Sequence, residues 1–223
     1  MAIDAWLLNQ HRQGKHPPTL RFYEWQPAAI SLGYHQRRYP KEWHDLTWAG
    51  RKVDIVRRPS GGRAVLHQGD LTYAVITSGL TGTVIQVYES VCQFLIEGWQ
   101  TLGTSLNYGG AGRGYIHQAN CFALATGSDL VDREGNKFIG SAQLRRGQAL
   151  LQHGSMLLQQ DPRLFERVFI APAPAHPLLR ADLSREKIIN VLTESASRCF
   201  GVNLIPQALS EEEWHSIDHH KNL

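Results

Sequence analysis

The chain has 223 residues, 42% of them hydrophobic and 19% charged, with a formal net charge of +3 at pH 7. This length and composition suit one sizeable globular domain, or one domain with a small appendage. No apolar run approaches the roughly 18 to 20 residues that span a bilayer, and no basic stripe is interleaved with aromatic residues. We therefore expect binding neither to a membrane nor to nucleic acid.

The N-terminus and the cysteines indicate the cytoplasm. The opening sequence MAIDAWLLNQ carries Asp4 early and has no basic region, so it is not a secretory signal. Cys92, Cys121 and Cys199 are odd in number and far apart, which favours neither a zinc site nor a disulfide framework. We expect a cytoplasmic protein without a bound metal.

The first half of the chain predicts short strands between helices. Apolar residues recur every three or four positions between residues 83 and 102, which is typical of a long helix with one buried face. Ile3, Trp6, Leu7 and Gln10 give a similar stripe at the start of the chain. We expect helices over residues 2–13, 40–48 and 83–102, and strands over residues 20–25, 30–33, 53–56, 63–66 and 71–76.

The second half predicts a glycine-rich loop, two hairpins and several helices. The loop covers residues 107–114, and the hairpins turn at residues 134–136 and 146–147. We expect strands over residues 130–131, 138–141 and 149–157, and helices over residues 161–169, over 184–200 and from Ser210 onward. This order supports an α/β (α+β) fold with a mixed β-sheet flanked by helices.

Residues 57–75, RRPSGGRAVLHQGDLTYAV, form the most informative stretch. Gly61 and Gly62 allow the backbone to approach a ligand closely, and the adjacent arginines can hold a carboxylate or phosphate. On chemistry alone, an ordinary glycine-rich hairpin with solvated arginines is an equal alternative.

Three motifs in the same order resemble those of the lipoate-protein ligase and octanoyltransferase family. They are MAIDAWLL at the start, RRPSGGRAVLH from Arg57, and GNKFIGSAQLRRGQALLQHGSMLL from Gly135. The resemblance covers roughly residues 1–170. It implies a biotin/lipoate protein ligase-like catalytic domain with a largely antiparallel sheet. We expect one domain over residues 1–223, in which residues 172–223 are a helical extension packed on the rest.

The resemblance also implies site residues. Lys137 matches the lysine that contacts the acyl carbonyl, although on spacing alone it could be an exposed strand lysine. His67 could orient a substrate, whereas we interpret His153 as structural. The implied substrate-binding residues are Arg57, Arg58, Ser60, Gly61, Gly62, Arg63, His67, Gly140, Ser141, Ala142 and Gln143.

Cys121 distinguishes between members of the family. A single cysteine is commonly an inert buried residue. Cys121 and Phe122, however, lie where octanoyltransferases that resemble the ligases carry a nucleophilic Cys-Phe pair. That resemblance implies a thioester acyl-enzyme, which needs no ATP because thioester exchange is nearly isoenergetic.

Other positions favour one class or the other. Arg63 stands where ATP-using ligases usually have a third glycine, which favours the transferases. Asp129 after Ser128 is more similar to the ligases. Gln68 stands where the family usually has aspartate, so a role needing a carboxylate there is in question. The strand that normally precedes the MAID helix has no counterpart, so we expect a start further upstream or a sheet that lacks this edge.

We interpret the sequence as a monomeric octanoyltransferase of lipoate biosynthesis that uses no cofactor. It would take an octanoyl group from acyl carrier protein and transfer it to a lipoyl-accepting domain, such as glycine cleavage H protein or the E2 subunit of a 2-oxoacid dehydrogenase. Three arginine doublets, at residues 37–38, 57–58 and 145–146, could steer the acidic carrier. The alternatives are an ATP- and Mg²⁺-dependent lipoate-protein ligase and an inactive acyl- or biotinyl-binding module.

Overall fold

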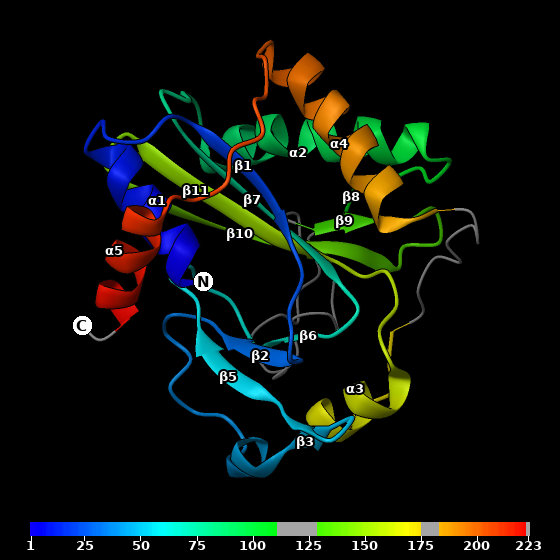
Figure 1. Ribbon diagram of the computed structural model, residues 1–223. Helices are drawn as coiled ribbons and strands as arrows, with labels where there is room; N and C mark the ends of the chain where they lie inside the picture. Colours follow the sequence, from blue (N-terminus) through cyan, green and yellow to red (C-terminus); the bar gives the residue numbers. More distant parts are fainter. Residues whose placement is uncertain (111–128, 175–182, 222–223) are drawn as a thin grey trace.

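A computed structural model describes residues 1–110, 129–174 and 183–221 (Figure 1). Its centre is a six-stranded sheet in which every neighbouring pair of strands is antiparallel. The strands lie in the order β1 (Thr19–Tyr23), β7 (Leu71–Ser78), β11 (Ala149–Met156), β10 (Lys137–Arg146), β9 (Asp129–Val131) and β8 (Asn107–Tyr108). The prediction of a largely antiparallel sheet is confirmed.

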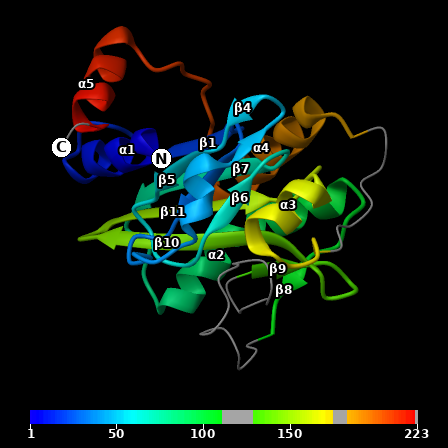
Figure 2. The ribbon, with the colours of Figure 1, turned by 90° about the horizontal axis from the view of Figure 1, so that it is seen from below.

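A three-stranded sheet carries the arginine and glycine loop. Strand β2 (Ala29–Leu32) lies between β5 (Asp54–Arg57), to which it is parallel, and β6 (Val65–His67), to which it is antiparallel. Residues 58–64 connect β5 to β6, so the loop starts and ends in this small sheet. Viewed from below, the small sheet lies in front of β10 and β11 (Figure 2).

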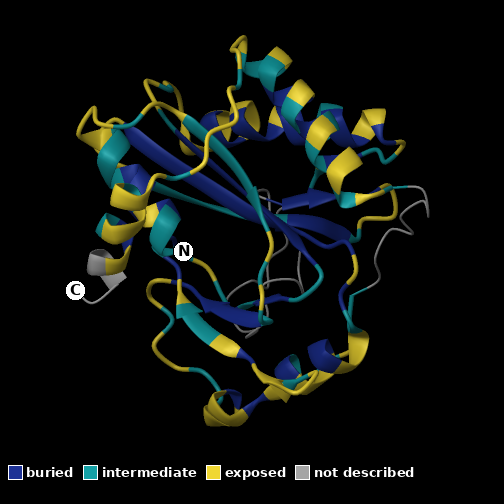
Figure 3. Cartoon of the chain, viewed as in Figure 1, coloured by how far each residue is buried: buried dark blue, intermediate teal, exposed yellow. Residues whose placement is uncertain are grey.

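Helices cover both faces of the large sheet. Helices α2 (Val84–Thr101) and α4 (Arg185–Phe200) pack on each other and on one face, and α1 (Ala2–Arg12) packs on the other. Alternate residues of β7 serve these two faces, because successive side chains of a strand point to opposite sides. Tyr73 and Val75 join the cluster under α2, whereas Ala74 and Ile76 pack with α1. Accordingly β7 and β11 are almost wholly buried (Figure 3).

A third apolar cluster lies beneath the small sheet. Ile30 and Leu66 pack there against Trp43 and Phe165, which come from a 3-10 helix η1 (Lys41–Asp45) and from α3 (Pro162–Phe169). Trp43 Nε1 donates a hydrogen bond of 2.9 Å to the Val168 carbonyl and ties these elements together. The short hairpin of β3 (Thr47–Trp48) and β4 (Arg51–Lys52) lies beside them.

The chain end packs back on the start of the molecule. Trp6 Nε1 of α1 donates a 2.9 Å hydrogen bond to Ser216 Oγ of α5 (Glu211–Lys221), and Ile217 is buried against α1. Helix α4 lies at the other face, so the two last helices cover opposite sides of the sheet (Figure 1). No described helix is long and apolar enough to cross a membrane.

The predicted helix starts follow from capping chemistry. Thr83 and Gln86 form a reciprocal capping box at α2, and Ser184 accepts the Lys187 N–H at α4. Gly201 ends α4 in a left-handed conformation that glycine adopts without strain. These predictions are confirmed to within one residue.

Two expectations about local structure are wrong. Residues 40–48 form the short 3-10 helix η1 followed by β3, not one helix. Asn107 and Tyr108 belong to the edge strand β8 and pair with β9, and the Tyr108 hydroxyl donates a 3.1 Å hydrogen bond to the Glu89 carbonyl. The predicted first helix is confirmed as α1, where Ile3 packs against the cluster that contains Trp6 and Leu7.

Gly33 and Gly61 give a matched test of how closely the backbone packs at the loop. A Cβ on Gly33 would overlap the carbonyl of Gly62, whereas a Cβ on Gly61 would meet no atom within 4 Å. We expect Gly33→Ala to lower the free energy of unfolding by about 2 kcal/mol or more, and Gly61→Ala to change it by less than about 0.5 kcal/mol. Urea unfolding of both variants would measure this, and equal stabilities would contradict the close approach.

Candidate active site

Two arginines hold the loop between β5 and β6 in shape. Arg58 is buried and donates from Nη1 to the Ser31 carbonyl at 2.9 Å, and from Nη2 to the carbonyls of Arg63 at 2.6 Å and Gly61 at 3.0 Å. Arg57 Nη1 donates to the carbonyls of Gly33 and Gln36, both at 2.8 Å. These hydrogen bonds hold the backbone of the loop in place, and the two guanidinium groups fix positive charge beside it.

Ser60 joins this loop to the large sheet. Its Oγ lies 2.5 Å from His153 Nε2 on β11, and His153 Nδ1 lies 3.3 Å from Asp4 Oδ2 on α1. All three side chains are buried. The arrangement places a hydroxyl, an imidazole and a carboxylate in one hydrogen-bonded row under the glycine turn.

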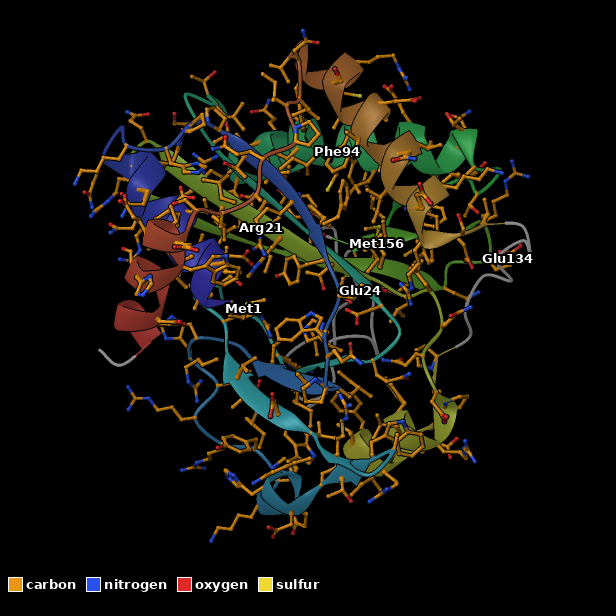
Figure 4. All side chains as sticks on the ribbon, viewed as in Figure 1. Met1, Arg21, Glu24, Phe94, Glu134 and Met156 are labelled. Atoms are coloured by element: carbon orange, nitrogen blue, oxygen red, sulfur yellow. The ribbon has the colours of Figure 1, made fainter. Side chains whose placement is uncertain are left out.

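The Asp4 carboxylate is ionised despite its complete burial. It accepts hydrogen bonds from Arg21 Nη1 and from the Tyr23 hydroxyl, both on β1, in addition to His153. Burial raises the pKa of Asp4, but the hydrogen bond of His153 and the charge of Arg21 outweigh it and bring the pKa from 3.8 to about 2. Figure 4 labels Arg21 on β1 and Met1 at the start of α1, the two elements that Asp4 joins.

The ionised Asp4 decides the tautomer that we assign to His153. A carboxylate can only accept, so Nδ1 of His153 carries the hydrogen and donates it. Nε2 of the neutral ring is then an acceptor, and the Ser60 hydroxyl must donate to it. Within this row of described residues, Ser60 Oγ keeps lone pairs that can accept a hydrogen bond from another group.

A second row of the same type surrounds His67. His67 Nε2 lies 2.8 Å from Ser31 Oγ, and its Nδ1 lies 2.8 Å from Asp70 Oδ2. Trp25 stacks on the imidazole with ring centroids 4.2 Å apart. His67 thus has a carboxylate partner although Gln68 follows it, because Asp70 supplies the carboxylate. Gln68 instead accepts the N–H of Asp161 at 2.6 Å, at the start of α3.

Lys137 is a buried lysine with a carboxylate partner. Its Nζ lies 2.9 Å from Asp129 Oδ1, and the two residues are 4% and 3% exposed. A β-bulge between Lys137 and Ile139 interrupts the pairing of β10 with β9 at this point. The alternative of an exposed strand lysine is therefore excluded.

The remaining predicted residues of β10 lie on two faces. Gly140 and Ala142 pair with Ser155 and His153, so they share the face that carries Asp4. Ser141 and Gln143 face α2, where Ser141 Oγ accepts from the Tyr73 hydroxyl at 2.8 Å and Gln143 donates to the Gln152 side chain at 2.6 Å. The GSAQ motif thus contributes side chains to both sides of the sheet.

The described cysteines are poorly suited to nucleophilic attack. Burial raises the pKa of the Cys92 thiol from 9.0 to about 12, and burial together with Glu97 raises that of Cys199. Both are therefore thiols at neutral pH. Cys121 lies outside the described residues, and its role stays a prediction.

Four residues of these rows were missed by the sequence analysis: Asp4, Trp25, Ser31 and Asp70. Asp4 carried a usable signal. It is an acidic residue one helical turn from Leu7 and Leu8, on the apolar face of α1, and a charge in that place requires a partner. Nothing in the sequence indicated that the Asp70 side chain bonds to His67 and is not exposed to solvent.

The two sheets and the loop between them define an α/β catalytic domain with a polar, partly ionised interior. The sequence profile of the lipoyl protein ligase A/B catalytic domain matches residues 1–194, and the chain belongs to this family. Octanoyltransferase LipM of Kyrpidia tusciae is 34% identical over 239 residues, which covers 96% of this chain and 86% of the relative. Octanoyltransferase LipM of Geobacillus kaustophilus is 37% identical over 241 residues, with the same coverage.

Solved structures agree with the fold. A T. acidophilum protein of the lipoate protein ligase type, with bound lipoic acid, superposes with a TM-score of 0.79 at 19% identity, covering 98% of this chain and 89% of that chain. Lipoate-protein ligase A bound with ATP gives a TM-score of 0.76 at 20% identity, covering 99% and 89%. The resemblance noted in the sequence is thereby confirmed.

Acid unfolding should reveal the buried Asp4. Because its pKa is lower in the folded protein than its ordinary 3.8, its contribution to stability is complete above about pH 4 and is lost as the pH falls towards 2. The lowered pKa corresponds to about 2 kcal/mol. We expect Asp4→Asn to be less stable than the wild type at pH 7, with a difference that narrows between pH 4 and pH 2.5. Urea unfolding at these pH values measures it, and a constant difference would contradict the assignment.

A double-mutant cycle tests the pair of Lys137 and Asp129. Lys137→Met leaves a buried carboxylate without its ammonium partner, so we expect a loss of about 3 kcal/mol or more. Asp129→Asn removes the carboxylate charge that Lys137→Met leaves unpaired. The double variant should therefore lose less free energy of unfolding than the two single variants together, by about 1 kcal/mol or more. Strict additivity in urea unfolding would show that the two charges are not coupled.

Proposed function

We propose that the protein is an octanoyltransferase of lipoate biosynthesis, which transfers an octanoyl group to a lysine of a lipoyl-accepting domain. The observation that carries this proposal is the identity of 34% and 37% with two octanoyltransferases over 96% of the chain. The chain also spans 86% of those relatives, so the similarity covers the body of the enzyme and not one module.

The proposed reaction passes through a thioester on Cys121. The Cys121 thiol loses its proton and attacks the acyl carbon of the donor thioester as a thiolate; a new C–S bond forms, the donor's C–S bond breaks, and the donor takes up that proton and leaves as a thiol. The amine of the acceptor lysine then attacks the acyl-enzyme, an amide C–N bond forms, and the Cys121 thiol is released. The raised pKa values of Cys92 and Cys199 support this choice of cysteine.

Lys137 is the proposed electrostatic group. An ammonium held in a buried position can stabilise the negative charge that develops on the acyl oxygen, and it needs no reorganisation to do so. Its burial and its pairing with Asp129 support such a fixed charge. The loop residues Arg57, Arg58, Ser60, Gly61, Gly62, Arg63 and His67, with Gly140, Ser141, Ala142 and Gln143, are the proposed lining of the acyl site.

The proposed donor is octanoyl-acyl carrier protein, an acidic partner. Arg37 with Arg38 and Arg145 with Arg146 are exposed doublets that can attract it. The proposed cellular location is the cytoplasm, and the proposed reaction uses no nucleotide. The ATP-dependent ligase is the second candidate, and the observation that favours it is Asp129, the ligase-like residue, in contact with Lys137.

Intact mass spectrometry separates the two candidates and tests Cys121. We expect the protein, incubated with octanoyl-acyl carrier protein but without nucleotide, Mg²⁺ or acceptor, to gain one octanoyl group that neutral hydroxylamine removes. Cys121→Ser should lose this adduct, because a serine hydroxyl lacks the acidity of a thiol.

Cys92→Ser and Cys199→Ser are the matched controls and should keep the adduct. An adduct that persists in Cys121→Ser would contradict the proposed nucleophile. Acyl transfer from free lipoate that requires ATP, with none from the carrier, would favour the ligase.

A further inference from the structure

The hydrogen bonds of Ser60, His153 and Asp4 allow a proton to move in one direction, from Ser60 towards His153. Asp4 is ionised and holds the Nδ1 hydrogen of His153, and Nε2 of His153 accepts from the Ser60 hydroxyl at 2.5 Å. A proton that arrives at Ser60 Oγ can therefore displace the hydroxyl hydrogen onto Nε2. The resulting imidazolium lies beside a buried carboxylate, which stabilises it.

The groups around His153 come from four elements. On β11 it lies between Ala74 of β7 and Ala142 of β10, which do not titrate. Asp4 of α1 supplies the negative charge, and Ser60 of the loop supplies the hydroxyl. Arg21 and Tyr23 of β1 bond to Asp4, and the N-terminal amine acts on it electrostatically.

We propose that Ser60, His153 and Asp4 form a proton relay that deprotonates the attacking lysine of the acceptor. In this relay Ser60 Oγ accepts an N–H of the lysine, and His153 and Asp4 act through Ser60 as positioning residues. The inference rests on the proposed function and specifies which of its steps needs a base.

The proton balance of the two steps differs. In acyl loading a thiol replaces a thiol, so no net proton is released. In transfer to lysine, the ammonium R–NH₃⁺ loses one proton to become nucleophilic, and a second goes to the departing sulfur when the C–N bond forms and the C–S bond breaks. The first proton is the net product, and we assign it to Ser60 and thence to His153 Nε2. Loading only moves the Cys121 proton to the departing donor thiol, so a net proton acceptor is required only for transfer.

A structural role would behave differently. If the row merely tied the loop to β11, its removal would weaken loading and transfer alike, because Ser60 lies in the loop that both steps use. Its removal would also leave the pH profile of transfer unchanged. The ratio of the transfer rate to the loading rate, and the pH profile of transfer, therefore distinguish a proton relay from a purely structural contact.

Single-turnover kinetics of the full chain test the relay. The enzyme is loaded from octanoyl-acyl carrier protein, freed of donor and mixed with a lipoyl-accepting domain, and both rates are followed by mass spectrometry from pH 6 to pH 9. In the wild type, the relay should keep transfer fast at pH 7, where most of the acceptor lysine is still an ammonium ion. In His153→Gln the ratio of transfer to loading should fall by about 100-fold or more at pH 7. Transfer in that variant should recover at high pH, where more acceptor lysine is already deprotonated.

Two further variants keep the test decisive if His153→Gln does not fold. Ser60→Ala should lower the ratio of transfer to loading as His153→Gln does, and Ser60→Thr, which restores the hydroxyl, should restore most of that ratio. His11→Gln is the matched control, because His11 also bonds to a serine, Ser78, at 3.0 Å, but on the exposed end of α1. It should leave both rates unchanged.

Other outcomes would overturn the relay. An equal loss of loading and transfer with an unaltered pH profile would show a structural tie. A hydroxylamine-resistant ester on Ser60 would show that the serine is itself a nucleophile. A wild-type protein that never acquires an octanoyl group would refute the proposed function, and the relay with it.

Discussion

The buried carboxylate of Asp4 is the interaction on which the arrangement of the site depends. It receives hydrogen bonds from β1 and from β11, and through His153 it reaches the loop of the small sheet. Removing an ionised carboxylate from water costs several kcal/mol unless partners replace its hydration. The buried carboxylate is therefore stable only when β1 and β11 hold its partners against α1. The site can form only after these elements have packed together.

Polar contacts also join the two sheets. Ser60 meets His153, and Asp70 accepts from Ser155 at 2.6 Å while it holds His67. An apolar interface could slide by one residue at modest cost, whereas a hydrogen-bonded one leaves buried groups unsatisfied when it slips. The loop is thus held at one register against β11, and this is the precision that a reacting acyl group requires.

The local elements could be predicted from the sequence because their causes are local. The stripe of Val87, Val91 and Leu95, with the cap at Thr83, indicated α2, and the glycines at 135 and 147 indicated the hairpin turns. The loop at residues 57–67 was found from its motif. The contact of His153 with Asp4 spans 149 residues, and the pairing of His67 with Asp70 depends on a side chain turning inward. Neither contact leaves a periodic pattern in the sequence, so the partners of His153 and His67 could not be predicted.

Strand β11 separates two chemical environments. On the face towards α2, Gln152 donates to the Tyr73 hydroxyl at 3.0 Å and to Cys92 Sγ at 3.2 Å, and these partners are neutral. Burial is the largest effect on Cys92 and outweighs the hydrogen bonds of Gln152, Tyr88 and Tyr73, so the pKa of the thiol rises to about 12. On the opposite face, one residue further along, His153 lies beside a carboxylate whose pKa is about 2. Successive side chains of β11 point to opposite faces of the sheet. One face therefore contacts the protonated thiol of Cys92, and the other carries the imidazole of His153 beside the ionised carboxylate of Asp4.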